Sequence, residues 1–264
     1  MNLARLRKGT QVLTIVLVLL VPLLNKKGIT VVMGSLYSFA IGPLWITDPL
    51  IGFQTVLTTM TADRTLLLSM VLPVVLALVL GRVFCGWACP QNTLSEFVDF
   101  AATKFGIERP WGKGTTATMR YSVLVVILIL TLLLKVPLAS LLSAPGIISV
   151  QTAKLIYEGT VGLELGLIAL IVLFELFLVR RGWCNYICPV GSFLGIFRFT
   201  RTLKVVFSEE GDHVCGKCLA CADACNLGLN PMEAGIYPQC HNCGACISAC
   251  EKMKADKKPL VFKF

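Results

Sequence analysis

Two runs of four cysteines near the C-terminal end restrict the fold of this chain more than any other feature. Both runs have the spacing C-x2-C-x2-C-x3-C. The first consists of Cys215, Cys218, Cys221 and Cys225, and the second of Cys240, Cys243, Cys246 and Cys250. Three thiolates in such a tight loop cap one face of a 4Fe–4S cube and leave the fourth iron to a cysteine farther away. The spacing therefore predicts a small domain folded around two cubes.

The fourth cysteine of each run is expected to bind the cube of the other run, as it does in bacterial two-cluster ferredoxins. This exchange predicts two ligand sets: Cys215, Cys218, Cys221 and Cys250 for one cube, and Cys240, Cys243, Cys246 and Cys225 for the other. Asn226 and Glu251 stand where a proline commonly follows the last cysteine of a run. We expect this difference to loosen the turn and to leave the number of ligands unchanged.

Zinc and disulfides are the competing interpretations of these cysteines. A zinc ribbon uses two C-x2-C pairs separated by a longer loop, which leaves the third and fourth cysteines of each run unused. Disulfides need an oxidising compartment. The first apolar stretch is followed by Asn25-Lys26-Lys27 rather than by the small residues of a signal-peptide cleavage site. Two complete runs in tandem favour iron–sulfur clusters over both alternatives.

Outside the cysteine runs, the composition is that of an α-helical integral membrane protein. Hydrophobic residues make up 56% of the 264 residues and charged residues 15%, and the mean hydropathy is +0.78. A soluble globular domain is more polar. The formal net charge of +9 arises before the tail, because the residues from Val205 onward include six Lys and seven Asp or Glu. We interpret this charge as a topology signal and expect no nucleic-acid partner.

The chain is predicted to form two domains, a membrane domain over residues 1–204 and a ferredoxin-like α+β domain over residues 205–264. Four apolar stretches predict transmembrane helices in contact with lipid: Val12–Leu24 with an extension toward Leu3, Thr65–Phe84, Tyr121–Leu134 and Gly162–Val179. Gly and Pro interrupt Gly28–Gln54 and the residues around Pro137 and Pro145, which favours interfacial or re-entrant segments there. Gln91–Arg120 is predicted to be a polar connection.

Lysine and arginine are concentrated at one end of the predicted spans, for example at Arg5, Arg82, Arg109 and Arg180. The positive-inside rule places this end in the cytoplasm. We therefore expect a multi-pass protein of the bacterial inner membrane, with both termini and the tail on the cytoplasmic side.

The motif C-x3-C-P occurs twice, directly after the second and the fourth predicted span. Cys85 and Cys89 form the first pair, and Cys184 and Cys188 recur 99 positions later. Two spans separate the pairs, so both emerge on the same side, as expected for parallel repeats related by an axis along the membrane normal. The four cysteines are predicted to bind a third iron–sulfur centre or another metal, or to form reversible disulfides. The alternative is buried apolar cysteines at helix ends.

Glu175 lies inside the fourth predicted span, nine residues before Cys184. A carboxylate inside a membrane is costly and indicates a functional site, and a helix places this one about 13 Å deeper than the cysteine. Quinol oxidation releases two electrons and two protons, so Glu175 is a candidate proton acceptor; the alternative is a structural hydrogen bond to another helix.

Four further residues have less specific interpretations. Asp48, which precedes Pro49, is predicted to cap a helix or form a turn. Trp87 and Trp183 fit an interfacial aromatic belt or a shield around a cofactor. His241 lies inside the second run; it is predicted to be exposed in a loop, and the alternative is that it tunes the cluster of that run.

With these residues in view, the chain resembles the NapH/MauN family of ferredoxin-type membrane proteins. The resemblance covers nearly the whole chain and is carried by Thr47–Leu50, Phe84–Pro90, Gly182–Gly191 and both cysteine runs. It implies a four-helix quinol dehydrogenase subunit with two 4Fe–4S clusters. It also implies electron transfer from menaquinol or ubiquinol, through a ferredoxin-like partner of the NapG type or a cytochrome c-type partner, toward periplasmic acceptors such as nitrate reductase.

The function predicted from these features is electron transfer in a membrane, with quinol as donor and iron–sulfur centres as carriers. The same parts would serve quinone reduction from a cytoplasmic donor. A different class of function is an assembly or maturation factor that supplies electrons or metal to another membrane enzyme. A third is a sensor or a structural anchor.

Overall fold

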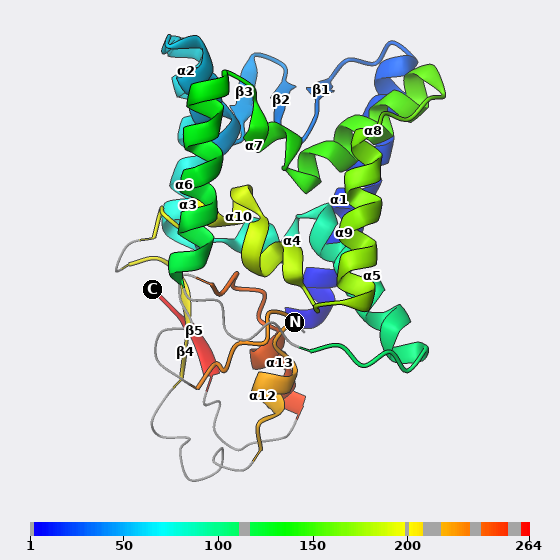
Figure 1. Ribbon diagram of the computed structural model, residues 1–264, viewed down its shortest axis with the longest axis vertical. Coiled ribbons are helices and arrows are strands. Elements are labelled where there is room, and N and C mark those ends of the chain that lie inside the picture. The colour runs from blue at the N-terminus through cyan, green and yellow to red at the C-terminus, as the bar shows by residue number, and fades with distance from the viewer. Residues whose placement is uncertain (1–2, 111–116, 199–200, 208–217, 233–238, 253–259) are drawn as a thin grey trace.

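The computed structural model describes residues 3–110, 117–198, 201–207, 218–232, 239–252 and 260–264. Figure 1 shows two helical arms above a smaller tail: α2, α3 and α6 form one arm and α1, α8 and α9 the other, with α4 and α10 between them near the tail.

The first half of the helical part begins with a long helix, continues through a small sheet and ends in four helices. Its elements are α1 (Leu3–Lys26), β1 (Val32–Gly34), β2 (Ser38–Ile41), β3 (Leu44–Thr47), α2 (Pro49–Thr59), α3 (Arg64–Leu80), α4 (Val83–Trp87) and α5 (Pro90–Lys104).

The second half repeats this order with a short helix in place of the sheet. Its elements are α6 (Ala117–Leu134), α7 (Leu138–Leu141), α8 (Ala144–Glu158), α9 (Glu164–Phe177), the single π-helical turn η1 (Trp183–Ile187) and α10 (Pro189–Leu194). The first helix of each half packs against the other half: α1 against α8, and α6 against α2. This reciprocal packing agrees with the repeat inferred from the cysteine motifs.

The structure differs from the expectation for Gly28–Gln54, because residues 32–47 form a three-stranded antiparallel sheet of order β1-β2-β3. Ile41 pairs with Leu44, so Gly42 and Pro43 alone connect β2 to β3. Gly42 has a φ of 58°, which favours glycine in a tight hairpin. Asp48 then caps α2 as predicted, since its carboxylate accepts a hydrogen bond of 2.8 Å from the amide of Leu50.

The predicted polar connection over Gln91–Arg120 also differs, because its first part is the helix α5. The helix begins at Pro90, whose fixed φ suits the first position of a helix. The face of α5 that includes Ser95, Asp99 and Ala102 is buried, and α5 packs against α1, α8 and α9. Its buried face is mostly polar, so the hydropathy pattern did not reveal it.

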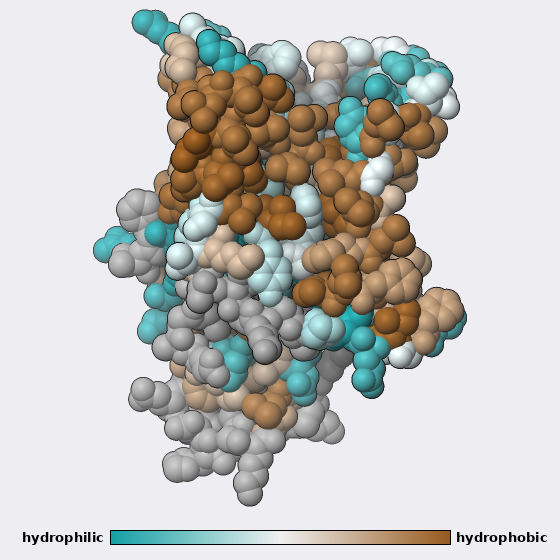
Figure 2. All heavy atoms as spheres, viewed as in Figure 1, coloured by the Kyte–Doolittle hydropathy of each residue, from teal (hydrophilic) through white to brown (hydrophobic). Residues whose placement is uncertain are grey.

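Two described helices, α1 and α6, are long and apolar enough to cross a membrane, with 24 and 18 residues. Their most apolar windows are only 11% and 22% buried, and Figure 2 shows hydrophobic residues over much of both arms. The apolar helix α3 is shorter, with 17 residues, and α9 has 14. Four membrane spans stay a prediction.

The tail is held together by a two-stranded antiparallel sheet of β4 (Lys204–Phe207) and β5 (Leu260–Lys263). The helices α12 (Ala220–Asp223) and α13 (Ala245–Lys252) pack against each other beside it. Val205, Cys221, Cys246, Ile247 and Leu260 form the buried core of the tail. Strand β4 starts at the expected boundary between the two parts of the chain, and it pairs with the last strand of the chain.

A glycine at the start of α8 gives a test of this arrangement. A Cβ at Gly146 would overlap the ring of Tyr37, and the Tyr37 hydroxyl is fixed by a hydrogen bond of 2.7 Å to the Ser140 carbonyl. We expect Gly146→Ala to lower the free energy of unfolding by about 1–3 kcal/mol, the usual cost of overpacking. Thermal unfolding in detergent measures this. Gly166→Ala is the matched control, because its Cβ would meet nothing within 4 Å; equal melting temperatures of the two variants would contradict the contact.

Candidate metal centres

The structure brings the two C-x3-C-P motifs together at the end of the helical part nearest the tail. Cys85 lies in α4 and Cys184 in η1, while Cys89 and Cys188 occupy the positions just before α5 and α10. Each of Cys89, Cys184 and Cys188 is within electrostatic range of at least one cysteine of the other motif. All four are free thiols. We call Cys85, Cys89, Cys184 and Cys188 the four-cysteine site.

The proline of each motif explains why the second cysteine faces backbone amides. Proline disfavours a helical conformation in the preceding residue and favours the first position of a helix itself. Cys89 and Cys188 therefore become helix caps. The Gly191 amide donates to the Cys188 Sγ at 3.5 Å, whereas the Cys89 thiol makes no capping hydrogen bond and the nearby amides of Gln91 and Asn92 only lower its pKa. Such donors stabilise a thiolate.

Burial works against ionisation of these thiols. It is the largest cause of the raised pKa of Cys89, Cys184 and Cys188. The positive charges of Arg120 and Arg82 oppose it and pull the pKa of Cys188 down. The site thus holds neutral thiols unless a bound cation stabilises the thiolates.

Two buried arginines adjoin the four-cysteine site. Arg82 is 5% exposed and Arg120 is 3% exposed. Both reach Gly191, where a Cβ would lie 2.6 Å from the Arg82 Nη2 and 3.3 Å from the Arg120 Nη2. Among the described residues, the Arg120 Nη2 has no hydrogen-bond partner. Buried charges of one sign require an anion nearby.

These arginines and thiols fit an iron–sulfur cluster. Four thiolates around a cluster carry a net negative charge that the guanidinium pair would neutralise, whereas two disulfides carry none. In the described part of the chain, no group of three or more His, Cys, Asp or Glu side chains is arranged to hold a single metal ion. A cube spreads its thiolates over different irons, so its ligands are spaced more widely than those of one ion.

The second cysteine run lines a cavity in the tail together with one cysteine of the first run. The lining includes Cys225, Cys240, Cys243 and Cys246, the set that the spacing predicts for one cube. The Leu229 amide donates to the Cys225 Sγ at 3.4 Å. The remaining wall is mostly apolar, which excludes water from the thiols. We call these four cysteines the second-run site.

The other predicted ligand set is described only in part, because Cys215 lies outside the described residues. Cys218 is exposed, Cys221 is buried and Cys250 is partly buried. Cys221 and Cys250 pack in the same core of the tail. We call Cys215, Cys218, Cys221 and Cys250 the first-run site.

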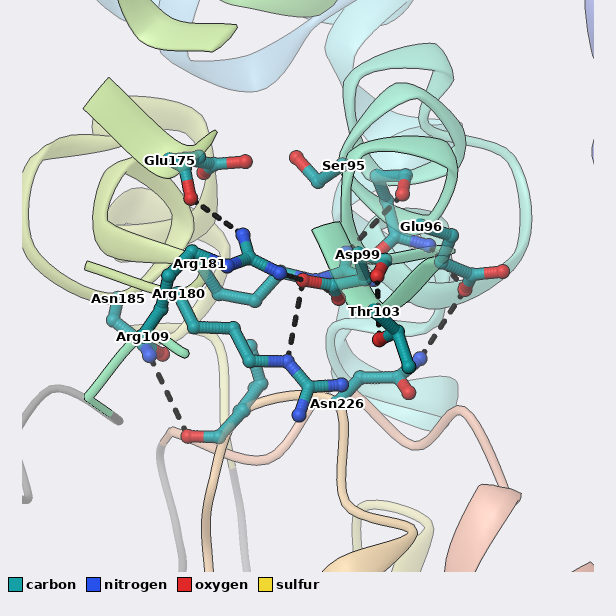
Figure 3. A network of polar contacts seen from close by, with 12 residues as sticks. Ser95, Glu96, Asp99, Thr103, Arg109, Glu175, Arg180, Arg181, Asn185 and Asn226 are labelled. Atoms are coloured by element: carbon teal, nitrogen blue, oxygen red, sulfur yellow. Dashed lines mark hydrogen bonds and ion pairs between the residues drawn. The ribbon is translucent and has the colours of Figure 1, made fainter. Parts of the chain in front are cut away.

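Glu175 lies next to the four-cysteine site, and its charge acts on Cys184. The side chain is 1% exposed, and the Ser95 side chain and the Trp183 backbone lie close enough to act on its carboxylate. Its Oε1 has no hydrogen-bond partner among the described residues. Figure 3 shows Glu175 and Ser95 facing each other from α9 and α5. Both interpretations of Glu175, a proton acceptor and a structural hydrogen bond between helices, stay predictions.

Helix α5 carries a network of ion pairs that the sequence did not indicate (Figure 3). Asp99 binds three arginines: Arg109 at 3.0 Å, Arg180 at 3.2 Å and Arg181 at 2.8 Å. Arg181, which is 1% exposed, also donates to the Asn92 side-chain oxygen at 2.9 Å. These bonds fix the segment between α9 and η1, and with it Cys184.

One turn earlier on α5, Glu96 joins three parts of the chain. It pairs with Arg7 at 3.4 Å and with Lys8 from α1. It also accepts a hydrogen bond of 3.2 Å from Asn226 in the tail. The sequence signal for this role was two acids at spacing i, i+3, six and nine residues after Pro90.

The prediction that His241 is exposed was wrong. His241 is 4% exposed and packs against Gly86, because the tail folds back on the helical part. Trp87 donates a hydrogen bond of 3.0 Å from its indole nitrogen to the Asn242 carbonyl, and Trp183 is 5% exposed in a core cluster. Trp183 thus packs inside the protein, whereas Trp87 is partly buried at the contact with the tail.

Comparison with known proteins supports the repeat. A family described as "4Fe-4S binding domain" matches twice, over residues 65–108 and 161–205. Each match contains one C-x3-C-P motif, and neither includes a cysteine run of the tail. No solved structure matches the chain.

Curated relatives cover most of the chain. The methylamine utilization ferredoxin-type protein MauN of Methylorubrum extorquens is 34% identical over 81% of this chain and 72% of its own. An uncharacterized protein of Methanocaldococcus jannaschii is 31% identical over 71% of this chain and 76% of its own. The ferredoxin-type protein NapH of Haemophilus influenzae is 26% identical over 83% of this chain and 75% of its own.

The family match and the twelve cysteines support iron–sulfur clusters as the cofactor. The identity to MauN extends over more than two thirds of both chains. The chain belongs to the family of ferredoxin-type proteins that includes NapH and MauN.

Proposed function

We propose that this protein is a membrane electron-transfer subunit that oxidises quinol and passes the electrons to a redox partner protein. The observation that carries the proposal is the position of the four-cysteine site, which lies between the apolar helical arms and the cysteine-lined cavity of the tail. Bound iron–sulfur clusters would supply one-electron transfer at these sites.

Three cubes are part of the proposal. The four-cysteine site would hold one, with Arg82 and Arg120 neutralising its charge. The second-run site and the first-run site would hold the others, with ligands exchanged between the runs. The names of the relatives, ferredoxin-type proteins, agree with iron–sulfur electron transfer.

The membrane orientation is also proposed. The exposed apolar faces of α1 and α6 support contact with lipid, and α3 and α9 would complete four spans of an inner-membrane protein. Arg7, Arg109 and Arg181 cluster at the end that carries the tail, which the positive-inside rule assigns to the cytoplasm.

The chemistry of quinol requires a proton acceptor, because each quinol releases two protons with its two electrons. We assign this role to Glu175, which is buried, has one oxygen without a partner among the described residues and lies beside Cys184.

Replacing this carboxylate gives a direct test of its role. We expect Glu175→Gln to slow quinol oxidation by about 10²-fold, the usual contribution of a general base. The iron content stays that of the wild type, because glutamine keeps the side-chain shape. Glu158→Gln is the matched control, since Glu158 lies at the far end of α8. Unchanged turnover in Glu175→Gln would remove Glu175 from the mechanism.

The proposed function is tested by poising purified, cluster-loaded protein in liposomes with a quinone pool. The EPR signal of reduced clusters is expected to grow when the pool is reduced with menaquinol or ubiquinol and to fade when it is oxidised. An EPR signal that does not change with the redox state of the quinone pool would contradict quinol oxidation. A gene deletion separates the assembly-factor alternative: lost electron flux with an intact terminal enzyme supports our proposal, and an enzyme that lacks its metal contradicts it.

A further inference from the structure

The tail is fastened to the helical part beside the four-cysteine site. The Trp87 indole donates to the Asn242 carbonyl at 3.0 Å, and the Arg82 Nη1 donates to the Gln239 carbonyl at 3.0 Å. The Asn242 amide donates in return to the Leu80 carbonyl at 3.0 Å. The beginning of the second cysteine run thus lies against the end of α3 and against α4.

Gly86, the residue after Cys85, makes the closest approach in this contact. A Cβ at Gly86 would lie 2.7 Å from the His241 Cδ2, 3.0 Å from the His241 carbonyl oxygen and 3.1 Å from the Cys243 Cβ. Side-chain carbons do not occupy such positions without displacing a neighbour. The absence of a side chain therefore allows the loop that carries Cys85 to contact the loop that carries Cys243.

The second repeat approaches the same cavity through the equivalent residue. Asn185 follows Cys184 as Gly86 follows Cys85. Asn185 is 5% exposed, and its Nδ2 donates to the Leu227 carbonyl at 3.4 Å. Leu227 lines the cavity next to Cys225, and its amide acts on the Cys225 thiol. Both C-x3-C-P motifs thus approach the loops that carry the second-run site by the residue after their first cysteine.

The first-run site has different surroundings. Cys218 is exposed to solvent. Cys221 in α12 and Cys250 in α13 pack in the core around Val205 and Leu260, which Cys246 of the second-run site shares, so exposure of Cys218 is what distinguishes the first-run site. A partner protein reaches an exposed ligand more readily than one in a buried cavity.

We infer that the second-run site is the point of electron exchange between the four-cysteine site and the tail, with Gly86 and Asn185 as the residues that position it. The exposed Cys218 is then the ligand at which a redox partner meets the tail. This inference rests on the proposed function. Each exchange oxidises one centre and reduces the other by one electron, and no atom or proton has to move between them.

The order of the sites is tested by EPR of the fully reduced protein, which detects interacting spins in neighbouring clusters without quinol or partner. Cys218→Ala removes a ligand of the first-run site, and Cys240→Ala removes one of the second-run site. In Cys218→Ala the second-run cluster remains, and we expect its EPR signal to be split by the four-cysteine centre. In Cys240→Ala the first-run cluster remains, and we expect its EPR signal to be unsplit. Iron and sulfide analysis of each variant checks that one cube is lost.

A splitting that persists in Cys240→Ala, or that is missing in Cys218→Ala, overturns the order while the clusters and the proposed function stand. Iron for only two cubes in the wild type overturns the three-cube proposal, and this inference with it. The two failures are therefore distinguished by iron content.

A second variant leaves all ligands in place. Gly86→Ala is expected to keep the full iron content and to weaken the splitting between the four-cysteine centre and the second-run cluster, because the added Cβ separates the loops. Gly166→Ala, whose Cβ would meet nothing within 4 Å, is expected to match the wild type. A wild-type splitting in Gly86→Ala contradicts the positioning role of Gly86.

Discussion

Replacing Asp99 by asparagine is expected to lower the free energy of unfolding by about 3–5 kcal/mol, the usual cost of removing one partner from a buried ion pair. Asp99 is the shared partner of Arg109, Arg180 and Arg181, and the Arg181 side chain is only 1% exposed. Asparagine keeps the size of the side chain and removes the charge. The lower free energy of unfolding would therefore come from three arginines that have lost the carboxylate they share.

The effect of Asp99→Asn is measured by thermal or denaturant unfolding in detergent. Asp63→Asn is the matched control, because Asp63 precedes α3 without a capping hydrogen bond from its side chain. We also expect cluster loss at the four-cysteine site, since Arg181 lies three residues before Cys184. An Asp99→Asn protein as stable as Asp63→Asn would show that the network contributes nothing to the fold.

Arg120→Met is expected to release the cluster of the four-cysteine site while the tail keeps its iron. Arg120 is buried beside Arg82, and its charge acts on Cys85, Cys184 and Cys188. Removing the cation leaves the negative charge of a thiolate-bound cluster partly uncompensated in a dry site. Uncompensated buried charge costs about 3–5 kcal/mol, which is a factor of roughly 10² to 4 × 10³ in affinity.

The release of this cluster is measured as the loss of iron and sulfide per protein when the protein is diluted into a chelator. Arg120→Lys is the matched control, since it keeps the positive charge and is expected to hold the cluster longer than Arg120→Met. Equal retention in wild type and Arg120→Met would argue against a negatively charged group at this site. That result would favour neutral thiols or disulfides instead.

Motif spacing and repetition predicted several features of this protein, including the approach of cysteines that are far apart in the sequence. The cysteine spacing predicted that Cys225 joins the second run, and the structure places Cys225, Cys240, Cys243 and Cys246 on one cavity. The repeat of C-x3-C-P predicted that four distant cysteines converge. The residue before Pro49 was predicted to cap a helix, and Asp48 does so.

Long-range contacts that no sequence motif marks were missed. Helix α5 buries Gln91, Ser95 and Asp99 against partners far away in sequence, and no hydropathy pattern encodes such a polar face. His241 is buried only because Gly86 lets the tail approach. The sheet over residues 32–47 consists of strands of three or four residues, too short for a clear alternation of polar and apolar residues.

The central claim is that the cysteines of this chain bind iron–sulfur cubes, at the four-cysteine site as well as in the tail. The most direct measurement is the iron, acid-labile sulfide and zinc content of protein purified without oxygen, in the wild type and in a variant with Cys85, Cys89, Cys184 and Cys188 changed to serine. We predict equal iron and sulfide for three cubes in the wild type, for two in the variant, and no stoichiometric zinc in either. Zinc in place of iron, or the same iron content in both proteins, would contradict this account.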